Sequence, residues 1–280
     1  MTTRMLAAAL GLLACVIVPI DINAWGGVGH HVVIRIALTR MTPEAMRLVT
    51  SLLGDEDVVE ASTWADRVRR DRPATYNWHF VNVPIDERKY VASRDCPATE
   101  AGDCVVAAIA RARAEIVNTA LSREARTESL KFLLHFVGDM HQPLHTIGNR
   151  DRGGNDVQTH VVGHEPVEGR GHPTLHSVWD SLLISRRGLD EAAYTALLLN
   201  RLRTEPLDEP ETIDVEAWAM EAHEIARRFV YAYSGFSTEG PPSASVKLDP
   251  TYQRIAEPIV DRQLIRAGLR LARILNEAAR

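Results

Sequence analysis

The sequence lacks the features that would assign it to several specialised classes of protein. It has no long basic run, because 32 basic residues are outnumbered by 37 acidic ones, and the net charge of -5 disfavours a conventional DNA-binding protein with a cationic face. It has no internal repeat, and beyond the amino-terminal segment no apolar run approaches membrane length. Aromatic residues are few, at 6%. The remaining composition, 45% hydrophobic and 25% charged, argues against disordered, collagen-like and coiled-coil chains and is typical of a soluble globular protein.

The amino terminus has the pattern of a secretory signal peptide. Residues Met1–Arg4 give a short positive start, Met5–Ile20 form an apolar run, and Ala24 ends the segment with a small side chain. The apolar run is too short and too poorly flanked for a membrane anchor, so we predict that residues 1–24 are removed on export to the periplasm or the medium. A lipoprotein cleavage site at Cys15 is the alternative.

Cysteine is scarce, and its few positions bear on the cellular compartment. Removal of the signal peptide would take away Cys15 and leave Cys96 and Cys104 within a short polar stretch. An even pair of cysteines in an exported chain predicts a local disulfide that closes a surface loop. Two free thiols are the alternative, which export disfavours.

Helical periodicity dominates residues 25–280, and no change of composition divides them. We therefore expect one mainly α-helical domain. Strand patterns are confined to residues 76–83 and 157–162, which predict at most a small β-hairpin. One expected helix begins at residue 43. The others span residues 29–38, 59–70, 102–120, 122–142, 174–186, 189–202, 213–234 and 251–279.

Two histidine–aspartate pairs suggest a metal site. His135 and Asp139, and likewise His176 and Asp180, are four residues apart, which places both side chains of a pair on one face of a helix. His145 follows shortly after the first pair. Neutral imidazole and carboxylate together suit zinc, and a carboxylate can bridge two ions. For either pair alone, a solvated or mutually hydrogen-bonded His/Asp pair is the alternative.

Further candidate ligands lie upstream. Asp66 follows Ser62-Thr-Trp-Ala, where a salt bridge to a nearby arginine is the alternative, and His79 lies between aromatic residues, where a buried core histidine is the default. Cleavage after Ala24 would give Trp25 a free α-amino group, which together with its own carbonyl can chelate a metal. The intervening glycines would permit turns that bring His30 to the same ion.

Six segments in order resemble the S1/P1 nuclease family, whose members are secreted zinc-dependent single-strand nucleases and 3′-nucleotidases. The segments are WGGVGH from Trp25, STWADRVRR, WHF, HFVGDMHQPLH, DRGGN and LHSVWD, and the segment PIVDRQL resembles the last helix of the family. The resemblance implies a mainly helical fold with three zinc ions in a cleft. It also implies single-stranded DNA, RNA and 3′-nucleotides as substrates, and a metal-activated water that attacks phosphorus in line and leaves 5′-phosphates.

The resemblance also implies the ligands of each ion, and all of them are present here. One zinc would be bound by Asp66, His79, His135 and Asp139; a second by the amino group and carbonyl of Trp25, His30 and the bridging Asp139; and the third by His145, His176 and Asp180. Asp66 and Asp139 would therefore contribute to catalysis as metal ligands.

The substrate residues follow in the same way. Arg69 is expected to stabilise charge in the transition state, with a surface salt bridge as the alternative, and Asn155 to contact phosphate or orient the site. Phe80 matches a ring that stacks on a nucleobase. Asn82 departs from the aspartate that several members have, which puts the base preference in doubt.

The remaining histidines have no role in this interpretation. His31, His141, His160, His164, His172 and His223 are expected in surface or loop positions, with His164 and His172 placed where they could touch substrate. A zinc-dependent phospholipase C is the enzymatic alternative for the chain, and an exported protein whose zinc only stabilises the fold is the non-enzymatic one. We expect a monomer with no membrane partner.

Overall fold

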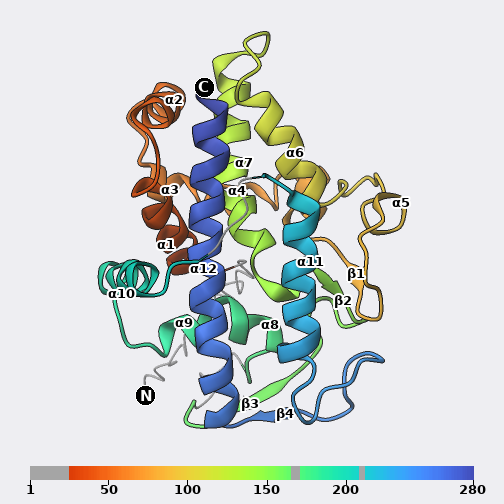
Figure 1. Cartoon of the computed structure of the whole chain (residues 1–280). Helices are drawn as coiled ribbons and strands as arrows, with labels where there is room; N and C mark the ends of the chain where they lie inside the picture. The colour runs from red at the N-terminus through yellow and green to blue at the C-terminus, as the bar shows by residue number, and fades with distance from the viewer. Residues whose placement is uncertain (1–24, 165–170, 208–211) are drawn as a thin grey trace, which may run out of the picture.

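The computed structural model describes residues 25–164, 171–207 and 212–280, and the predicted signal peptide lies outside them. The chain is mainly α-helical, as expected, and its two long helices α7 (Arg123–Met140) and α12 (Pro250–Ala278) lie against each other through the middle of the molecule (Figure 1). Within these described ranges no helix is long and apolar enough to cross a membrane.

Most predicted helices are present, and the structure divides several of them. The expected helix 59–70 breaks into two, while 174–186 and 213–234 each include a π-helical turn. The other helices are α1 (Gly27–Leu38), α2 (Pro43–Leu53), α3 (Val58–Ala61), α4 (Trp64–Val68), α5 (Ala92–Asp95), α6 (Val105–Glu115), α8 (Leu175–Ser177), α9 (Leu183–Ser185), α10 (Glu191–Thr204) and α11 (Val215–Ile225), with 3₁₀ turns η1 (Pro73–His79) and η2 (Pro143–His145) and π turns η3 (Val178–Leu182) and η4 (Ala226–Val230).

Short polar residues fix where the main helices begin. The side chains of Thr42, Ser122, Asp190, Asp214 and Asp249 each accept a hydrogen bond from a backbone N–H in the first turn that follows. These caps satisfy N–H groups that have no partner inside the helix. Between the caps, apolar faces meet in one core, in which α1 packs along α12 and α6 packs along α7.

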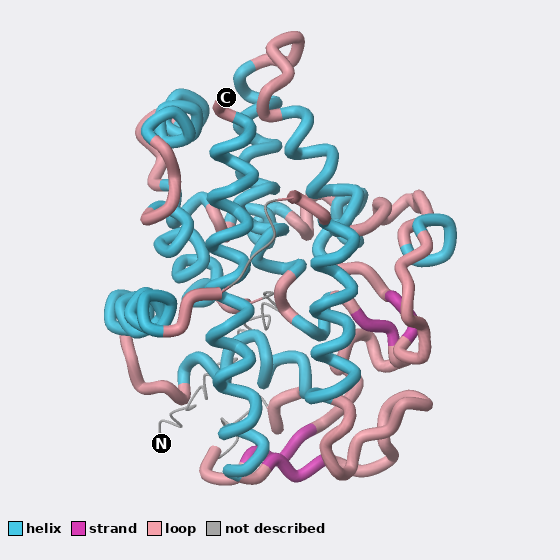
Figure 2. Tube along the Cα trace, in the orientation of Figure 1, coloured by secondary structure: helices cyan, strands magenta, loops and turns pink. Residues whose placement is uncertain are grey.

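The predicted β-hairpin is wrong. In the part of the chain that the structure describes, the strands form two parallel pairs, β1 (Val83–Pro84) with β2 (Ile147–Gly148) and β3 (Thr159–Val161) with β4 (Val246–Leu248), which appear in magenta in Figure 2. Each pair joins segments far apart in the sequence, and parallel strands cannot be connected by a tight turn. The first half of the expected strand at residues 76–83 is instead part of the 3₁₀ turn η1, and only Val83 lies in a strand.

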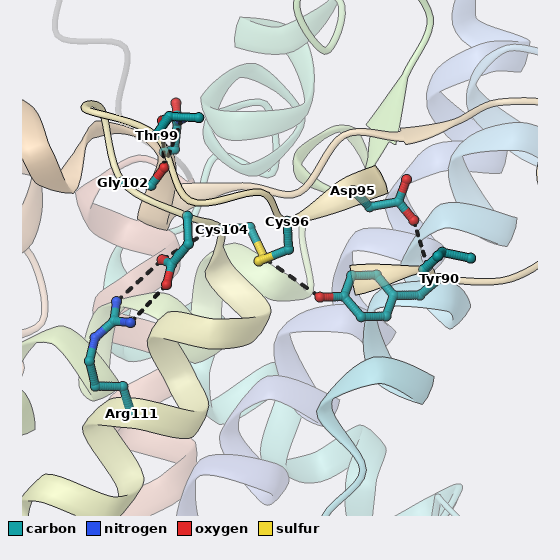
Figure 3. Close-up of a disulfide and its surroundings, with 10 residues drawn as sticks. Tyr90, Asp95, Cys96, Thr99, Gly102, Cys104 and Arg111 are labelled. Carbon is teal, nitrogen blue, oxygen red and sulfur yellow. Dashed lines mark hydrogen bonds and ion pairs between the residues drawn. A yellow bond between two sulfur atoms is a disulfide. The ribbon is translucent and has the colours of Figure 1, made fainter. Parts of the chain in front are cut away.

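The predicted disulfide between Cys96 and Cys104 is confirmed (Figure 3). The loop that it closes rests on η1, because the amide of Asn77 donates to the carbonyl of Ala101 at 2.8 Å and the Asn77 side chain donates to Thr99 Oγ1 at 3.2 Å. Directly after the disulfide, the amide of Val105 donates to the carbonyl of Phe80 at 3.0 Å. The disulfide loop therefore supports the segment that ends in His79 and Phe80.

Candidate metal centre

Buried histidine and aspartate side chains converge from six segments of the chain. They form three groups whose ligand atoms lie within 4.8 Å of one another in each group, close enough to share a metal ion. The groups are His30, Asp66 and His135; His79, His135 and Asp139; and His145, His176 and Asp180. His135 belongs to two of them, so these two groups adjoin.

The first two groups are centred on the end of α7. The Oδ2 atom of Asp139 lies 2.9 Å from Nδ1 of His79 and 3.2 Å from Nε2 of His135. Asp66, at the start of α4, places Oδ1 3.5 Å from the same His135 nitrogen. The other carboxylate oxygen of Asp139 lies 3.4 Å from Nε2 of His30, so Asp139 faces both sides, as a bridging ligand must.

Close packing of the amino-terminal segment against α7 brings His30 next to Asp139. Trp25 is fully buried, and its indole N–H donates to the carbonyl of Gly138 at 2.9 Å. A Cβ atom on Gly138 would lie 2.7 Å from Nδ1 of His30, and one on Gly29 would lie 2.7 Å from the Trp25 Cβ, so neither position has room for a side chain. Of the expected glycine turns, one is present at Trp25 and Gly26, and residues 27–30 form the first turn of α1. Gly29 and Gly138 in addition allow Trp25 and His30 to pack closely against the backbone.

The third group lies where η2 meets α8 and η3. Asp180 lies one helical turn after His176, at 3.1 Å from its Nε2, and 3.9 Å from Nε2 of His145. Gln142, which no sequence argument singled out, donates its amide Nε2 to Asp180 Oδ1 at 2.5 Å. Its own oxygen accepts from the amide of Leu144 at 2.6 Å, which fixes its orientation and so that of the carboxylate.

The donor atoms have the arrangement that a metal ion requires. In three of the histidines Nδ1 lies 2.7–2.8 Å from a backbone carbonyl, and because a carbonyl can only accept, Nδ1 is the donor and Nε2 is the nitrogen left to bind a metal. The partners are His135 with Ser62, His145 with His79 and His176 with Gly153. Several buried atoms have no hydrogen-bond partner, among them His30 Nε2, Asp66 Oδ1, Asp139 Oδ1 and His145 Nε2. Unpartnered buried acceptors are costly, and a cation would satisfy them.

The electrostatics of the site favour positive charge. Burial opposes protonation of His135, but the carboxylates of Asp139 and Asp66 outweigh it and raise the pKa of His135 to about 10. Burial lowers the pKa of His145 to about 4, so this imidazole is neutral and able to bind a metal at physiological pH. Two carboxylates thus stabilise one positive charge in a buried position, where a divalent cation would bind in place of the proton.

The expected substrate residues lie beside these groups but are less buried. The guanidinium of Arg69 lies over the ring of Tyr76 at 4.1 Å, three residues along the chain from Asp66. Phe80 is half-buried, with its ring edge-on to Tyr76. Asn82 is exposed next to Val81, whose amide donates to the carbonyl of His145 at 2.8 Å.

The last of these residues, Asn155, is held by its own loop. Its side chain donates to the carbonyl of Arg152 at 2.9 Å, and this bond closes the turn whose Gly153 carbonyl orients His176. In the structure Asn155 therefore supports the third group. Asp66 pairs with His79 and His135, so it lies in one of the groups that could hold a metal ion.

Two histidines expected at the surface are buried. His141 Nδ1 donates to the carbonyl of Val137 at 2.7 Å, and its Nε2 lies 3.0 Å from Nη1 of Arg270 on α12. The Nε2 of His223 donates to the carbonyl of Pro84 at 3.0 Å. Both tie a helix to a neighbouring segment, a role that depends on long-range contacts and leaves no local pattern in the sequence.

The fold and the site define a class: a mainly helical chain that gathers histidines and aspartates into adjoining metal-binding groups. Comparison with known proteins identifies the family. The model described as S1/P1 Nuclease matches residues 25–280, and the chain therefore belongs to the S1/P1 nuclease family, whose members are hydrolases of nucleic acids.

The chain also matches named relatives over nearly its whole length. Endonuclease 2 of Arabidopsis thaliana is 32% identical, with 91% of each chain covered, and Nuclease P1 of Penicillium citrinum is 27% identical over 90% of this chain and 97% of its own. Among solved structures, the alpha toxin from Clostridium absonum aligns with a TM-score of 0.42 and 16% identity, covering 92% of this chain and 67% of that one.

Proposed function

We propose that this chain is a zinc-dependent endonuclease that hydrolyses single-stranded DNA and RNA to 5′-phosphorylated products and also removes phosphate from 3′-nucleotides. The observation that carries the proposal is the pair of adjoining groups that share His135, with Asp139 turned toward both, inside a chain of the S1/P1 nuclease family. Two metal ions held close together can stabilise both the attacking and the leaving oxygen of a phosphodiester.

We assign three zinc ions to the site. Asp66, His79, His135 and Asp139 would hold the first, the Trp25 backbone with His30 and Asp139 the second, and His145, His176 and Asp180 the third. Imidazole nitrogens and carboxylate oxygens are the usual zinc donors, and the backbone carbonyls already fix three of the imidazoles. When bound, the ions supply Lewis acidity that activates water and offsets phosphate charge.

The side chains around the ions have separate tasks. Asp139 holds His79 and His135 in place through one oxygen and faces His30 with the other. Arg69 would neutralise charge that develops on the phosphate oxygens, and Asn155 would hold the loop beside the third ion. Phe80 would stack on an unpaired base, and Asn82 would hydrogen-bond its edge, which favours a single strand over a duplex.

Export belongs to the same proposal. The buried Trp25 would supply its α-amino group to the second ion only after cleavage between Ala24 and Trp25, so maturation in the periplasm or the medium would complete the site. The Cys96–Cys104 disulfide suits an oxidising compartment. We expect a monomeric enzyme, and Edman sequencing of the exported protein, with Trp25 as the first residue, checks the cleavage site.

One set of assays tests the function. The purified protein is incubated with single-stranded DNA, duplex DNA, RNA, 3′-AMP and a phosphatidylcholine emulsion, each with and without a chelator, and zinc per chain is measured. We expect chelator-sensitive hydrolysis of the single strands and of 3′-AMP, with little action on duplex. Hydrolysis of the emulsion in place of nucleic acid would make the chain a phospholipase, and bound zinc with no turnover would make the metal structural.

A further inference from the structure

In the described part of the chain, the side chain of Arg69 makes its hydrogen bond and its cation–π contact with the same residue, Tyr76. The guanidinium carbon lies 4.1 Å from the ring centroid, and Nη2 donates to the backbone carbonyl of Tyr76 at 3.3 Å. A guanidinium over an aromatic face is a favourable arrangement. The ring and the carbonyl of a single residue thus hold the arginine from two directions.

Neighbouring arginines are bound in another way. Arg72 lies over the ring of Trp64 at 5.2 Å but also forms an ion pair with Glu128, and Arg67 donates to Thr63 and to the carbonyl of Glu60. Over the ranges that the structure describes, Arg69 makes no ion pair with a carboxylate, and its Nε is buried without a hydrogen-bond partner. Tyr76 takes up one of its five N–H donors, and the other donors of the guanidinium group remain for an anion.

Tyr76 is itself fixed in place although its side chain is 45% exposed. It lies in η1, whose next residue, Asn77, is hydrogen-bonded to the disulfide loop, and its ring meets the edge of Phe80 at 6.1 Å between centroids. Because the ring of Tyr76 is exposed, it contributes little to the core. The backbone of η1 is nevertheless anchored through the hydrogen bond of Asn77 to the disulfide loop. A ring in this position can restrict the arginine without being needed for folding.

We propose that Tyr76 is a positioning residue that holds the guanidinium of Arg69 in the orientation in which it receives the phosphate of the substrate. The inference rests on the role of Arg69 in the proposed function. The ring face makes the contact, and among the described residues the hydroxyl of Tyr76 has no hydrogen-bond partner, so the aromatic ring is the part that matters.

A double-mutant cycle tests this inference. Arg69→Ala, Tyr76→Ala and the double variant are compared with the unaltered enzyme, with Tyr76→Phe to restore the ring and Tyr76→Leu to keep apolar bulk without a π face. Phe229→Ala is the matched control, because Phe229 is also 45% exposed but lies in η4. The readouts are kcat and KM on a single-stranded oligonucleotide, the inhibition constant of inorganic phosphate, zinc per chain and the melting temperature.

We expect Tyr76→Ala and Tyr76→Leu to lower kcat/KM by about 3- to 10-fold, the range of one cation–π contact, and to weaken phosphate inhibition in the same direction as Arg69→Ala. Tyr76→Phe should regain most of the activity, and the double variant should be no worse than Arg69→Ala alone. Zinc content and melting temperature should stay the same.

Three results would overturn the inference. They are a Tyr76→Ala enzyme with unchanged kinetics, losses that add fully in the double variant, and an Arg69→Ala enzyme with normal activity, which would leave Tyr76 nothing to position. An unaltered enzyme that fails to cleave single strands would refute the proposed function instead, so the two failures can be told apart.

Discussion

The proposed metal side and the proposed substrate side of the site are built differently. His135 and Asp139 are fully buried. Where an imidazole on the metal side bonds a backbone carbonyl, as His135 does with Ser62, that hydrogen bond fixes the orientation of the ring. On the proposed substrate side, Tyr76 and Asn82 are exposed, and the guanidinium group of Arg69 is held by Tyr76. Burial makes the first side intolerant of any change in charge or shape, whereas the second side can be altered without disturbing the fold.

The largest expected effect comes from Asp139→Asn on the metal side. The variant removes a charge that faces three histidines, and we expect a loss of at least about 10³-fold in turnover of single-stranded DNA, the scale of a lost electrostatic element. The exposed Asp156→Asn serves as the control. Near-normal turnover with full zinc content would contradict the bridging role.

The amino terminus offers the second test of the metal side. A protein made with methionine before Trp25 carries an amide in place of the α-amine, a poor ligand, while the buried indole is unchanged. We expect roughly one zinc fewer per chain and loss of most activity. Aminopeptidase trimming to Trp25 should restore both. Full zinc and activity before trimming would exclude the amino group as a ligand.

Gln142→Ala probes the support of the third group. Its amide orients Asp180 at 2.5 Å, so its loss should reduce metal affinity or activity by about 10- to 100-fold, as is usual for residues that orient ligands. Titration with a zinc indicator measures the affinity. Gln253→Ala is the control, because Gln253 on α12 also makes side-chain hydrogen bonds, to Arg186 and Glu257, but does not contact the third group. Equal zinc affinity in the two variants would argue against the orienting role.

Changes at Phe80 and Asn82 sharpen the comparison from the substrate side. Phe80→Ala should weaken binding by roughly 1–3 kcal/mol per base and raise KM more than it lowers kcat, with zinc content unchanged. Asn82→Asp should change the ranking among nucleobases, because a donor is lost. The measurement is KM on a set of 3′-nucleotides, and unchanged values in both variants would place the base site elsewhere.

The smallest effect on activity is expected from the double substitution Cys96→Ser with Cys104→Ser. Loss of this short loop closure should cost about 2–3 kcal/mol of the free energy of unfolding. Because the loop supports η1 and Phe80, KM should rise a few-fold while zinc per chain stays constant. Urea unfolding and kinetics on single-stranded DNA measure the two effects. A loss of zinc would show that the loop supports the metal side as well.

Much of the site could be predicted because its chemistry requires particular residue types. His135 and Asp139 stand one helical turn apart in an apolar helix, where such a pair is costly without a partner, and this signal is local. The helix boundaries also have local causes, such as Asp249 before Pro250 at the start of α12. The disulfide followed from two cysteines in a short polar stretch.

The sequence by itself therefore determined the helical class, the disulfide and the side chains able to bind metal, because each depends on spacing or residue type within a few positions. Only the tertiary structure decided that Gln142 orients Asp180, that His141 and His223 are buried, and that the short strands pair in parallel. It also decided that Tyr76 lies beneath Arg69. These features join segments whose separation along the chain carries no periodic signal, and they exist only once the core has brought the segments together.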